Sequence, residues 1–252
     1  MIEQLDGSKT GGKARASKPA YVRTMFARLA GRYDRVNRVV SLRQDMKWRR
    51  RAIDLAHVPP GGAVLDIGAG TGDLAGEVLR RDDSALAVGA DFCLEMMLRG
   101  RTRGRTRRSG QAEQDGRPIL WIGADALDLP FREASFDAVV SGYLLRNVAD
   151  LRRALTEQWR VLKPGGTVVS LDTTPLPPGW RSWPARCYFR AIVPLAGRIL
   201  GGDPEACTYL RTSTARFLRA EELAACMESA GFKGVQFERL MFKTMAIHWG
   251  HK

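Results

Sequence analysis

The chain has 252 residues, of which 44% are hydrophobic, and a formal net charge of +13, a composition that suits one large α/β domain with its own core. No apolar run reaches the roughly 20 residues of a membrane-spanning helix, which argues against a spanning protein. The four cysteines lack the spacing of a disulfide framework, which favours a reduced cytoplasm. Neither the cysteines nor the three histidines have metal-ligand spacing, which argues against a metal centre. The charge is equally compatible with solvated arginines and with an anionic partner, namely nucleic acid, a phospholipid surface or an acidic substrate.

The expected elements begin with a lead-in and a helical segment at the N-terminus. Residues 1–18 are polar and Gly-rich, lack the apolar stretch of a secretory signal, and are expected to be disordered. Residues 19–58 are expected to form a helical lid, with helices over 20–32 and 45–56. The first of these helices is indicated by four apolar residues at i, i+3, i+4 and i+7 spacing: Val22, Met25, Phe26 and Leu29.

From residue 63 onward, strand signals alternate with helical ones. Five short apolar runs are expected to be strands: 63–67, 86–90, 119–123, 136–141 and 167–171. Helical patterns lie between them or follow them: 74–80, 94–99, 151–162 and 221–230. Two further strands are expected at the C-terminus, over 235–240 and 244–249. This alternation predicts a doubly wound, mostly parallel, seven-stranded sheet with helices on both faces, within a single domain over 19–252.

Two segments interrupt the alternation. Residues 99–117 begin with six arginines interleaved with Gly and Thr, which is typical of a low-complexity basic loop. Residues 176–218 form an insertion after the fifth strand, rich in Trp, Phe and Arg, and are expected to cover the substrate side of the site. The alternative for this second segment is a simple packing helix.

The strongest motif joins the first strand to the next helix through a glycine-rich loop. Glycines allow the backbone to approach a ligand closely and to adopt positive φ. The spacing is G-x-G-x-G and not the G-x-G-x-x-G of dinucleotide-binding folds, so the loop can pass beneath an amino-acid group and a sulfonium instead of a pyrophosphate. A plain tight turn is the alternative. The motif supplies five expected cofactor residues: Asp66, Gly68, Gly70, Thr71 and Gly72.

Residues at the ends of later strands complete the expected cofactor site. Asp91 ends the second strand about 20 residues past the loop, where an acid can bind ribose hydroxyls; capping the next helix is its alternative role. Asp125, followed by Ala126, can accept a hydrogen bond from an adenine amino group, with a turn residue as the alternative. Ser141 and Gly142, at the end of the fourth strand, are the last two members of the set.

The order of these strands and cofactor motifs along the chain resembles that of the Rossmann-like class I S-adenosylmethionine-dependent methyltransferases. Four segments resemble one family among them, the C-methyltransferases of menaquinone and ubiquinone biosynthesis. Residues 26–37 (FARLAGRYDRVN) are similar to the family's F-x-x-(I/V)-A-x-x-Y-D-x-x-N opening. Residues 48–49 (WR) are similar to its K-x-W-(R/K), 145–148 (LRNV) match its L-R-N-V, and 248–252 (HWGHK) resemble its H-x-G-x-K ending. The resemblance covers residues 22–252.

This resemblance implies methyl transfer from S-adenosylmethionine to a ring carbon of a polyprenylated hydroquinone, either demethylmenaquinol or the analogous benzoquinol, without a metal. It also implies that Arg146 and Asn147 orient a water or the ring hydroxyl for deprotonation, with Arg146 stabilising the developing charge. An Arg146 that caps the next segment or pairs with Asp150 is the alternative. Tyr33 is expected to reach the substrate from the lid, or else to pack in the core.

Three departures from the family pattern fall where the quinone is expected: residues 172–175 (DTTP), 143–144 (YL) and 206–210 (ACTYL). These departures concern the substrate and not the cofactor, and a methyltransferase acting on RNA or on another small molecule is the alternative. A non-catalytic cofactor-binding protein is the third hypothesis. The expected partners are a polyprenyl quinol and an anionic membrane, contacted peripherally through residues 180–200 and the arginine segment. Nucleic acid is not expected, and a homo-oligomer is compatible with the sequence.

Overall fold

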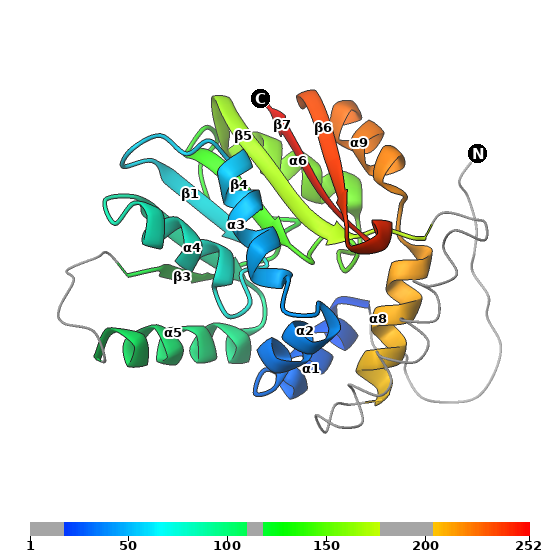
Figure 1. The fold of residues 1–252 in the computed structure, drawn as a ribbon. Helices are drawn as coiled ribbons and strands as arrows, with labels where there is room; N and C mark the ends of the chain where they lie inside the picture. Colours follow the sequence, from blue (N-terminus) through cyan, green and yellow to red (C-terminus); the bar gives the residue numbers. More distant parts are fainter. Residues whose placement is uncertain (1–17, 110–117, 177–203) are drawn as a thin grey trace.

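The computed structural model describes residues 18–109, 118–176 and 204–252, and Figure 1 shows them as one sheet with helices on both faces. The disordered lead-in expected over residues 1–18 lies outside the described residues except for Lys18. Residues 110–117 and 177–203, which belong to the two expected insertions, also lie outside them.

The sheet has seven strands in the order β3-β2-β1-β4-β5-β7-β6, and β7 is antiparallel to both of its neighbours. The remaining neighbouring strands are parallel. The prediction of a doubly wound, mostly parallel, seven-stranded sheet is therefore confirmed. The strands are β1 (Ala63–Ile67), β2 (Leu86–Asp91), β3 (Leu120–Gly123), β4 (Phe136–Gly142), β5 (Leu162–Thr173), β6 (Lys233–Leu240) and β7 (Met245–His251).

Both faces of the sheet are apolar and covered by helices, because successive side chains of a strand point to opposite faces. On one face, α3 (Asp45–Leu55) and α4 (Asp73–Arg81) pack against residues such as Val64. On the other face, α6 (Leu151–Val161) and α9 (Ala220–Ser229) pack against residues such as Leu65. Burying each large apolar side chain of this kind contributes roughly 1.5–3 kcal/mol.

Three further helices, α1 (Lys18–Leu29), α2 (Tyr33–Val40) and α8 (Pro204–Arg216), gather beyond the carboxyl ends of the central strands (Figure 1). Ligands bind at this edge in open α/β sheets. A short 3-10 turn, η2 (Met241–Lys243), connects β6 to β7 close to α8. The helical character expected for residues 19–58 is present, as three helices instead of two.

The arginine-rich segment corrects one prediction. Helix α5 (Leu94–Ser109) continues through all six arginines, so residues 99–109 are helical and not a loop. Arginine is a good helix former in spite of its charge. In addition, Arg103 forms ion pairs with Asp34 and Asp73, which offsets part of the repulsion between neighbouring cations.

Candidate active site

The glycine-rich loop turns sharply between β1 and α4. Gly68, Gly70 and Gly72 have φ values of +67°, +56° and +77°, in the left-handed region that side chains disfavour. The amides of Gly68 and Ala69 donate to the carbonyl of Ala90, which ties the loop to β2. A Cβ on Gly72 would lie 2.6 Å from the Trp121 ring, so this glycine serves packing as well as backbone conformation.

Asp66 lies beneath this loop and is 1% exposed. Its Oδ2 accepts a hydrogen bond from the Ala75 amide at 3.1 Å, whereas its Oδ1 is buried without a hydrogen-bond partner among the described residues. Burial raises the pKa of Asp66 to about 8. A buried carboxylate oxygen without a partner is costly, and a cationic ligand group would satisfy it.

Asp91, at the end of β2, is 7% exposed and accepts two backbone hydrogen bonds. The amide of Gly70 donates to its Oδ2 at 2.7 Å and the amide of Cys93 to its Oδ1 at 2.8 Å. Burial raises the pKa of Asp91, although these backbone donors act in the opposite direction. Asp91 therefore orders the glycine loop and the residue that precedes α5.

The other expected cofactor residues have different surroundings. Asp125 is exposed and accepts a hydrogen bond from the Leu127 amide at 2.9 Å, so it has the role of a turn residue. Ala126, the next residue, is buried. Ser141 is buried and donates to the Ser170 hydroxyl at 3.3 Å. Gly142 borders a cavity of about 30 Å³ that also reaches the glycine loop. The cavity is lined by Tyr33, Arg49, Asp66, Gly68, Ala69, Gly70, Thr71, Asp73, Leu74, Gly142 and Tyr143.

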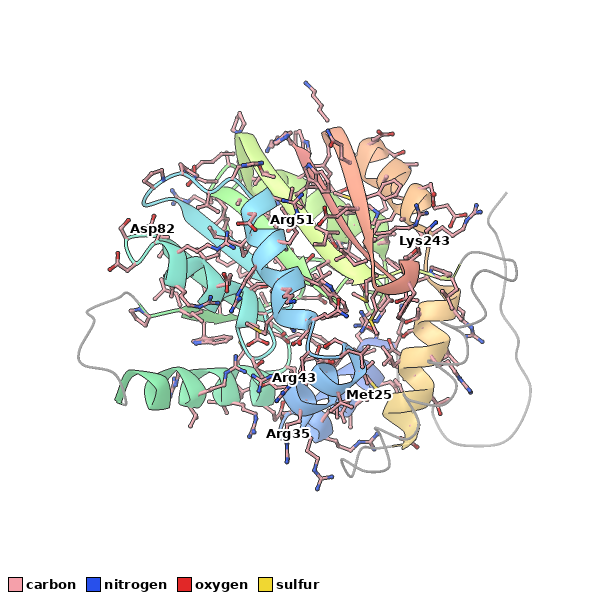
Figure 2. The ribbon with its side chains drawn as sticks, in the orientation of Figure 1. Met25, Arg35, Arg43, Arg51, Asp82 and Lys243 are labelled. Atoms are coloured by element: carbon pink, nitrogen blue, oxygen red, sulfur yellow. The ribbon has the colours of Figure 1, made fainter. Side chains whose placement is uncertain are left out.

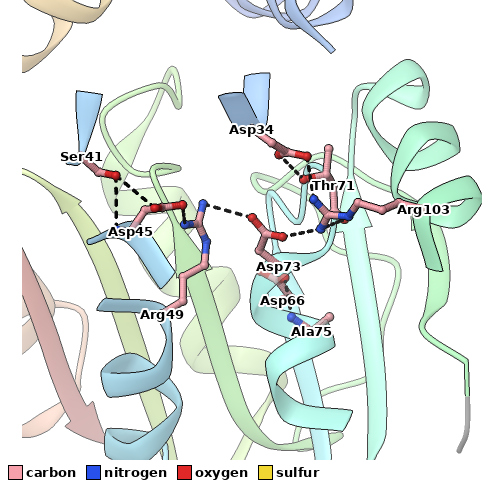
Figure 3. A network of polar contacts seen from close by, with 9 residues as sticks. All are labelled: Asp34, Ser41, Asp45, Arg49, Asp66, Thr71, Asp73, Ala75 and Arg103. Atoms are coloured by element: carbon pink, nitrogen blue, oxygen red, sulfur yellow. Dashed lines mark hydrogen bonds and ion pairs between the residues drawn. The ribbon is translucent and has the colours of Figure 1, made fainter. Parts of the chain in front are cut away.

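A polar network fastens the helical lid over this loop (Figure 3). The Thr71 hydroxyl donates to Asp34 at 2.9 Å, and Arg103 of α5 forms ion pairs with Asp34 and Asp73. Arg49 of α3 lies 3.5 Å from Asp73 and 2.8 Å from Asp45. Four segments distant in sequence therefore meet at the start of α4. Arg103 and Asp73 were not predicted from the sequence as members of this site, whereas Arg49 belongs to the W-R segment that resembles the family pattern.

Arg146 is buried in the loop after β4 and pairs with Asp172 at the end of β5. Its Nη1 lies 2.5 Å from Asp172 Oδ1, and its guanidinium lies 5.3 Å from the centre of the Tyr143 ring. Burial acts against the charge of Arg146, but Asp172 outweighs this effect and the pKa lies above its ordinary value. The alternative partner, Asp150, instead accepts from the Arg153 amide as the N-cap of α6. The Arg146 Nε is buried without a hydrogen-bond partner in the described chain.

The Asn147 side chain is held by two hydrogen bonds, one within its own loop and one from α8. Its amide donates to the Tyr143 carbonyl at 2.7 Å, and its Oδ1 accepts from the Tyr209 hydroxyl of α8 at 3.0 Å. Lys18, at the start of α1, donates to the Val148 carbonyl at 2.7 Å. The lid and α8 thus close on the loop that carries Arg146 and Asn147.

Tyr33 lines the smaller cavity together with the glycine loop. Burial raises the pKa of its hydroxyl, and the nearby Arg146 and Arg49 charges act in the opposite direction. Its ring packs edge-on against Phe26, at 5.7 Å between ring centres. Tyr33 is therefore a packed residue that also borders the smaller cavity.

A second, largely apolar cavity of about 360 Å³ adjoins the first, since Tyr143 lines both. It is enclosed by the lid, the end of β5, α8 and the η2 turn. The described residues that line it are Asn37, Val40, Ser41, Trp48, Tyr143, Arg146, Thr173, Thr174, Pro175, Leu176, Leu210, Arg211, Thr214, Ala215, Met241, Thr244 and Met245. Residues 173–175, one of the departures noted in the sequence, do line this cavity, whereas the wall from η2 and β7 was not foreseen.

The fold and the glycine loop define a class I S-adenosylmethionine-dependent methyltransferase. A methyltransferase of this kind from Thermotoga maritima has a similar fold, with a TM-score of 0.62 at 23% identity over 91% of this chain and 98% of that one. The arsenic(III) methyltransferase of Chlamydomonas reinhardtii gives a TM-score of 0.56 at 19% identity, covering 81% of this chain and 73% of that one.

The chain belongs to the ubiE/COQ5 methyltransferase family, whose sequence profile matches residues 14–252. It is 43% identical to the ubiquinone/menaquinone biosynthesis C-methyltransferase UbiE of Desulfotalea psychrophila, over 94% of this chain and 92% of that protein. It is 41% identical to the demethylmenaquinone methyltransferase of Thermus thermophilus, over 90% of this chain and all of that protein. The resemblance seen in the sequence motifs is confirmed.

Within this family, the contact between Tyr209 and Asn147 yields a testable expectation. Tyr209→Phe should lower turnover by about 2- to 12-fold, the value of one net hydrogen bond, because Asn147 loses the donor that fixes its orientation. Cofactor affinity should not change. Tyr21→Phe is the matched control, since the Tyr21 ring packs 5.7 Å from that of Tyr209. Equal losses in both variants, in a steady-state assay, would show that only ring packing matters.

Proposed function

We propose that this chain transfers a methyl group from S-adenosylmethionine to a ring carbon of a polyprenylated hydroquinone, with demethylmenaquinol as the substrate and menaquinol as the product. The names of the Roseiflexus and Thermus relatives, both demethylmenaquinone methyltransferases, support this substrate. The observation that carries the proposal is the apolar cavity of about 360 Å³, which has a buried arginine in its wall and shares Tyr143 with the smaller cavity at the glycine loop.

The residues around the glycine loop fit the cofactor. Asp66 offers an unpartnered carboxylate oxygen to an ammonium group, and Asp91 offers acceptors to ribose hydroxyls. Asp125, exposed beyond the end of β3, is available to an adenine amino group. Bound S-adenosylmethionine would supply an electrophilic methyl group.

The residues of the larger cavity fit an aromatic ring that bears hydroxyls. A reduced quinone ring becomes a carbon nucleophile once one hydroxyl loses its proton, and the charge left on oxygen must be stabilised. Methyl transfer would then break the methyl–sulfur bond and release S-adenosylhomocysteine, and the methylated ring carbon would lose its proton to restore the aromatic ring. Arg146 presents a fixed positive charge and an unpaired Nε donor for this purpose, held in place by Asp172. Asn147, the next residue of the same loop, and Tyr33, which borders the smaller cavity, would orient the hydroxyl or a water that accepts its proton.

The raised pKa of Asp66 predicts a pH dependence of cofactor binding. The folded protein without ligand keeps the Asp66 proton up to about pH 8, whereas the ordinary value is 3.8. Its contribution to stability is therefore present at low pH and is lost as the pH rises through about 8. A ligand ammonium needs the ionised form, so the affinity for S-adenosylhomocysteine should rise over the same range with release of a proton.

Calorimetry in two buffers of different ionisation enthalpy measures this proton release. Asp66→Asn should bind more weakly and should release no proton through this group. The matched control is Asp83→Asn, which makes the same chemical change at an exposed position beyond α4. Equal proton release by Asp66→Asn and the unchanged protein would contradict the assignment of Asp66.

The most informative test of the proposed function is incubation with methyl-labelled S-adenosylmethionine and a panel of naphthoquinols, benzoquinols and RNA. We expect label in naphthoquinols. The arginine segment made RNA the main alternative, but Arg103, one of its members, pairs with Asp34 and Asp73 inside the protein. Label in RNA with none in any quinol would overturn the proposal.

A further inference from the structure

Two loops border the larger cavity, and each exposes an apolar side chain next to a cation. Between α2 and α3, Leu42 is 49% exposed and is followed by the exposed Arg43. In the η2 turn, Phe242 is 62% exposed and is followed by the exposed Lys243. Both cations are labelled in Figure 2. The residues just before the two pairs, Ser41 and Met241, line the cavity, so we call Leu42-Arg43 and Phe242-Lys243 the rim tips.

Both rim tips have an unfavourable backbone conformation. Leu42 and Arg43 have φ values of +53° and +61°, and Phe242 and Lys243 have values of +54° and +67°. Side chains with a Cβ disfavour this region, so such residues persist only where surrounding contacts hold them. Backbone hydrogen bonds do so here: the Arg43 amide donates to Arg38, and the Thr244 amide donates to Met241.

The apolar side chains of the rim tips are exposed to solvent. Leu42 and Phe242 are both exposed at these backbone positions, whereas most other large apolar side chains among the described residues are buried. Strain of this kind tends to occur at functional sites, because a sequence without a function there could replace the residues by glycine. The exposed side chains therefore call for an occupant that is apolar.

The positive charges next to the exposed side chains indicate that the occupant is also anionic. Each apolar tip has a cation as its direct neighbour, and a further exposed cation, Arg211, lines the same cavity. Apolar side chains flanked by cations suit the boundary between acyl chains and anionic headgroups. Two separate tips, each next to a residue that lines the same cavity, also suit a fluid surface better than a shaped protein partner.

We propose that the rim tips dock the mouth of the larger cavity onto an anionic lipid surface, with Leu42 and Phe242 inserted between headgroups and Arg43 and Lys243 on the phosphates. The inference rests on the proposed function, because a polyprenyl quinol resides in a bilayer and must pass from it into the cavity. Docking at the mouth allows that passage without exposing the tail to water.

Flotation with vesicles of phosphatidylglycerol or phosphatidylcholine tests the docking surface without substrate. The double variant R43Q/K243Q should lower partition onto phosphatidylglycerol by on the order of 20-fold, about five-fold for each cation. Its matched control is R152Q/K233Q, which removes one Arg and one Lys at exposed positions on α6 and β6 and should change partition little. Leu42→Ser and Phe242→Ser should each weaken binding, whereas Leu120→Ser, at a 47% exposed position on β3, should not.

Activity measured beside flotation separates this inference from the proposed function. The rim variants should methylate a short-tailed, water-dispersed quinol as the unchanged protein does, and should lose activity on a long-tailed quinol in vesicles. Vesicle binding that depends on the tips, with no quinol methylated, would overturn the proposed function alone. Rim variants that bind vesicles like their controls would overturn the docking surface. A change in oligomeric state by light scattering, without a change in vesicle binding, would assign the tips to contact between copies and would also overturn it.

Discussion

Arg146→Ala is expected to lower turnover by about 10²–10³-fold while the affinity for the cofactor stays nearly constant. The guanidinium is buried in the wall of the larger cavity, where it would face the ring oxygen and not the sulfonium. Steady-state kinetics gives the turnover, and calorimetry with S-adenosylhomocysteine gives the affinity. A parallel loss of both would make Arg146 a structural residue.

A double variant separates chemistry from stability at this site. Arg146→Ala alone leaves the Asp172 carboxylate, which is 1% exposed, without its cation, and breaking a buried pair in this way costs about 3–5 kcal/mol. R146A/D172N removes both charges and should recover much of the thermal stability. Its turnover should remain as low as that of the single variant. Recovery of turnover together with stability would contradict the proposed role in charge stabilisation.

Asp91→Ala is expected to weaken cofactor binding by about 10- to 150-fold, which corresponds to the roughly 1.5–3 kcal/mol of a charged hydrogen bond. The loss has two parts, because Asp91 would bind the ribose and also accepts the Gly70 amide that shapes the glycine loop. Calorimetry with S-adenosylhomocysteine measures it. Asp83→Ala, the same change at an exposed position, is the control and should bind normally. A folded Asp91→Ala protein with unchanged affinity would refute the placement of the ribose.

Gly70→Val tests whether the backbone conformation of the glycine-rich loop is needed for cofactor binding. Gly70 has a φ of +56°, and a Cβ there would lie 3.3 Å from Met96 Cε. A β-branched side chain should therefore shift the loop and weaken cofactor binding along with stability. Thermal unfolding with and without S-adenosylhomocysteine should show a smaller stabilisation by ligand than in the unchanged protein. An equal stabilisation would mean that the loop tolerates the shift.

The sheet and the glycine-rich loop could be predicted from the sequence, because both depend on local patterns. The alternation of apolar runs with helical patterns predicted the series of strands. The G-x-G-x-G motif, with Asp91 about 20 residues after it, predicted the edge of the sheet at which the cofactor is expected. Parallel strands bring their carboxyl ends to one edge, so Asp66, Asp91 and Arg146 were expected together there. Their proximity follows from topology and needs no knowledge of side-chain contacts.

Contacts between distant segments could not be predicted in the same way. The nearest carboxylate in sequence, Asp150, was the expected alternative partner of Arg146, yet the actual partner is Asp172 on the next strand. The helical state of residues 99–109 was missed because composition alone favours a loop, and the carboxylates that pair with Arg103 lie about 30 and 70 residues away. The wall of the larger cavity likewise combines six segments whose proximity only the fold determines.

Carbon NMR of the product tests the central claim most directly. The protein is incubated with S-adenosylmethionine labelled at the methyl carbon and with a short-tailed demethylmenaquinol analogue, and the labelled product is examined for its bond to the ring. We predict a methyl group bonded to a ring carbon, formed by the unchanged protein and nearly absent with Arg146→Ala. A methyl group on a ring oxygen, or no labelled quinol under conditions in which the cofactor binds, would contradict the account.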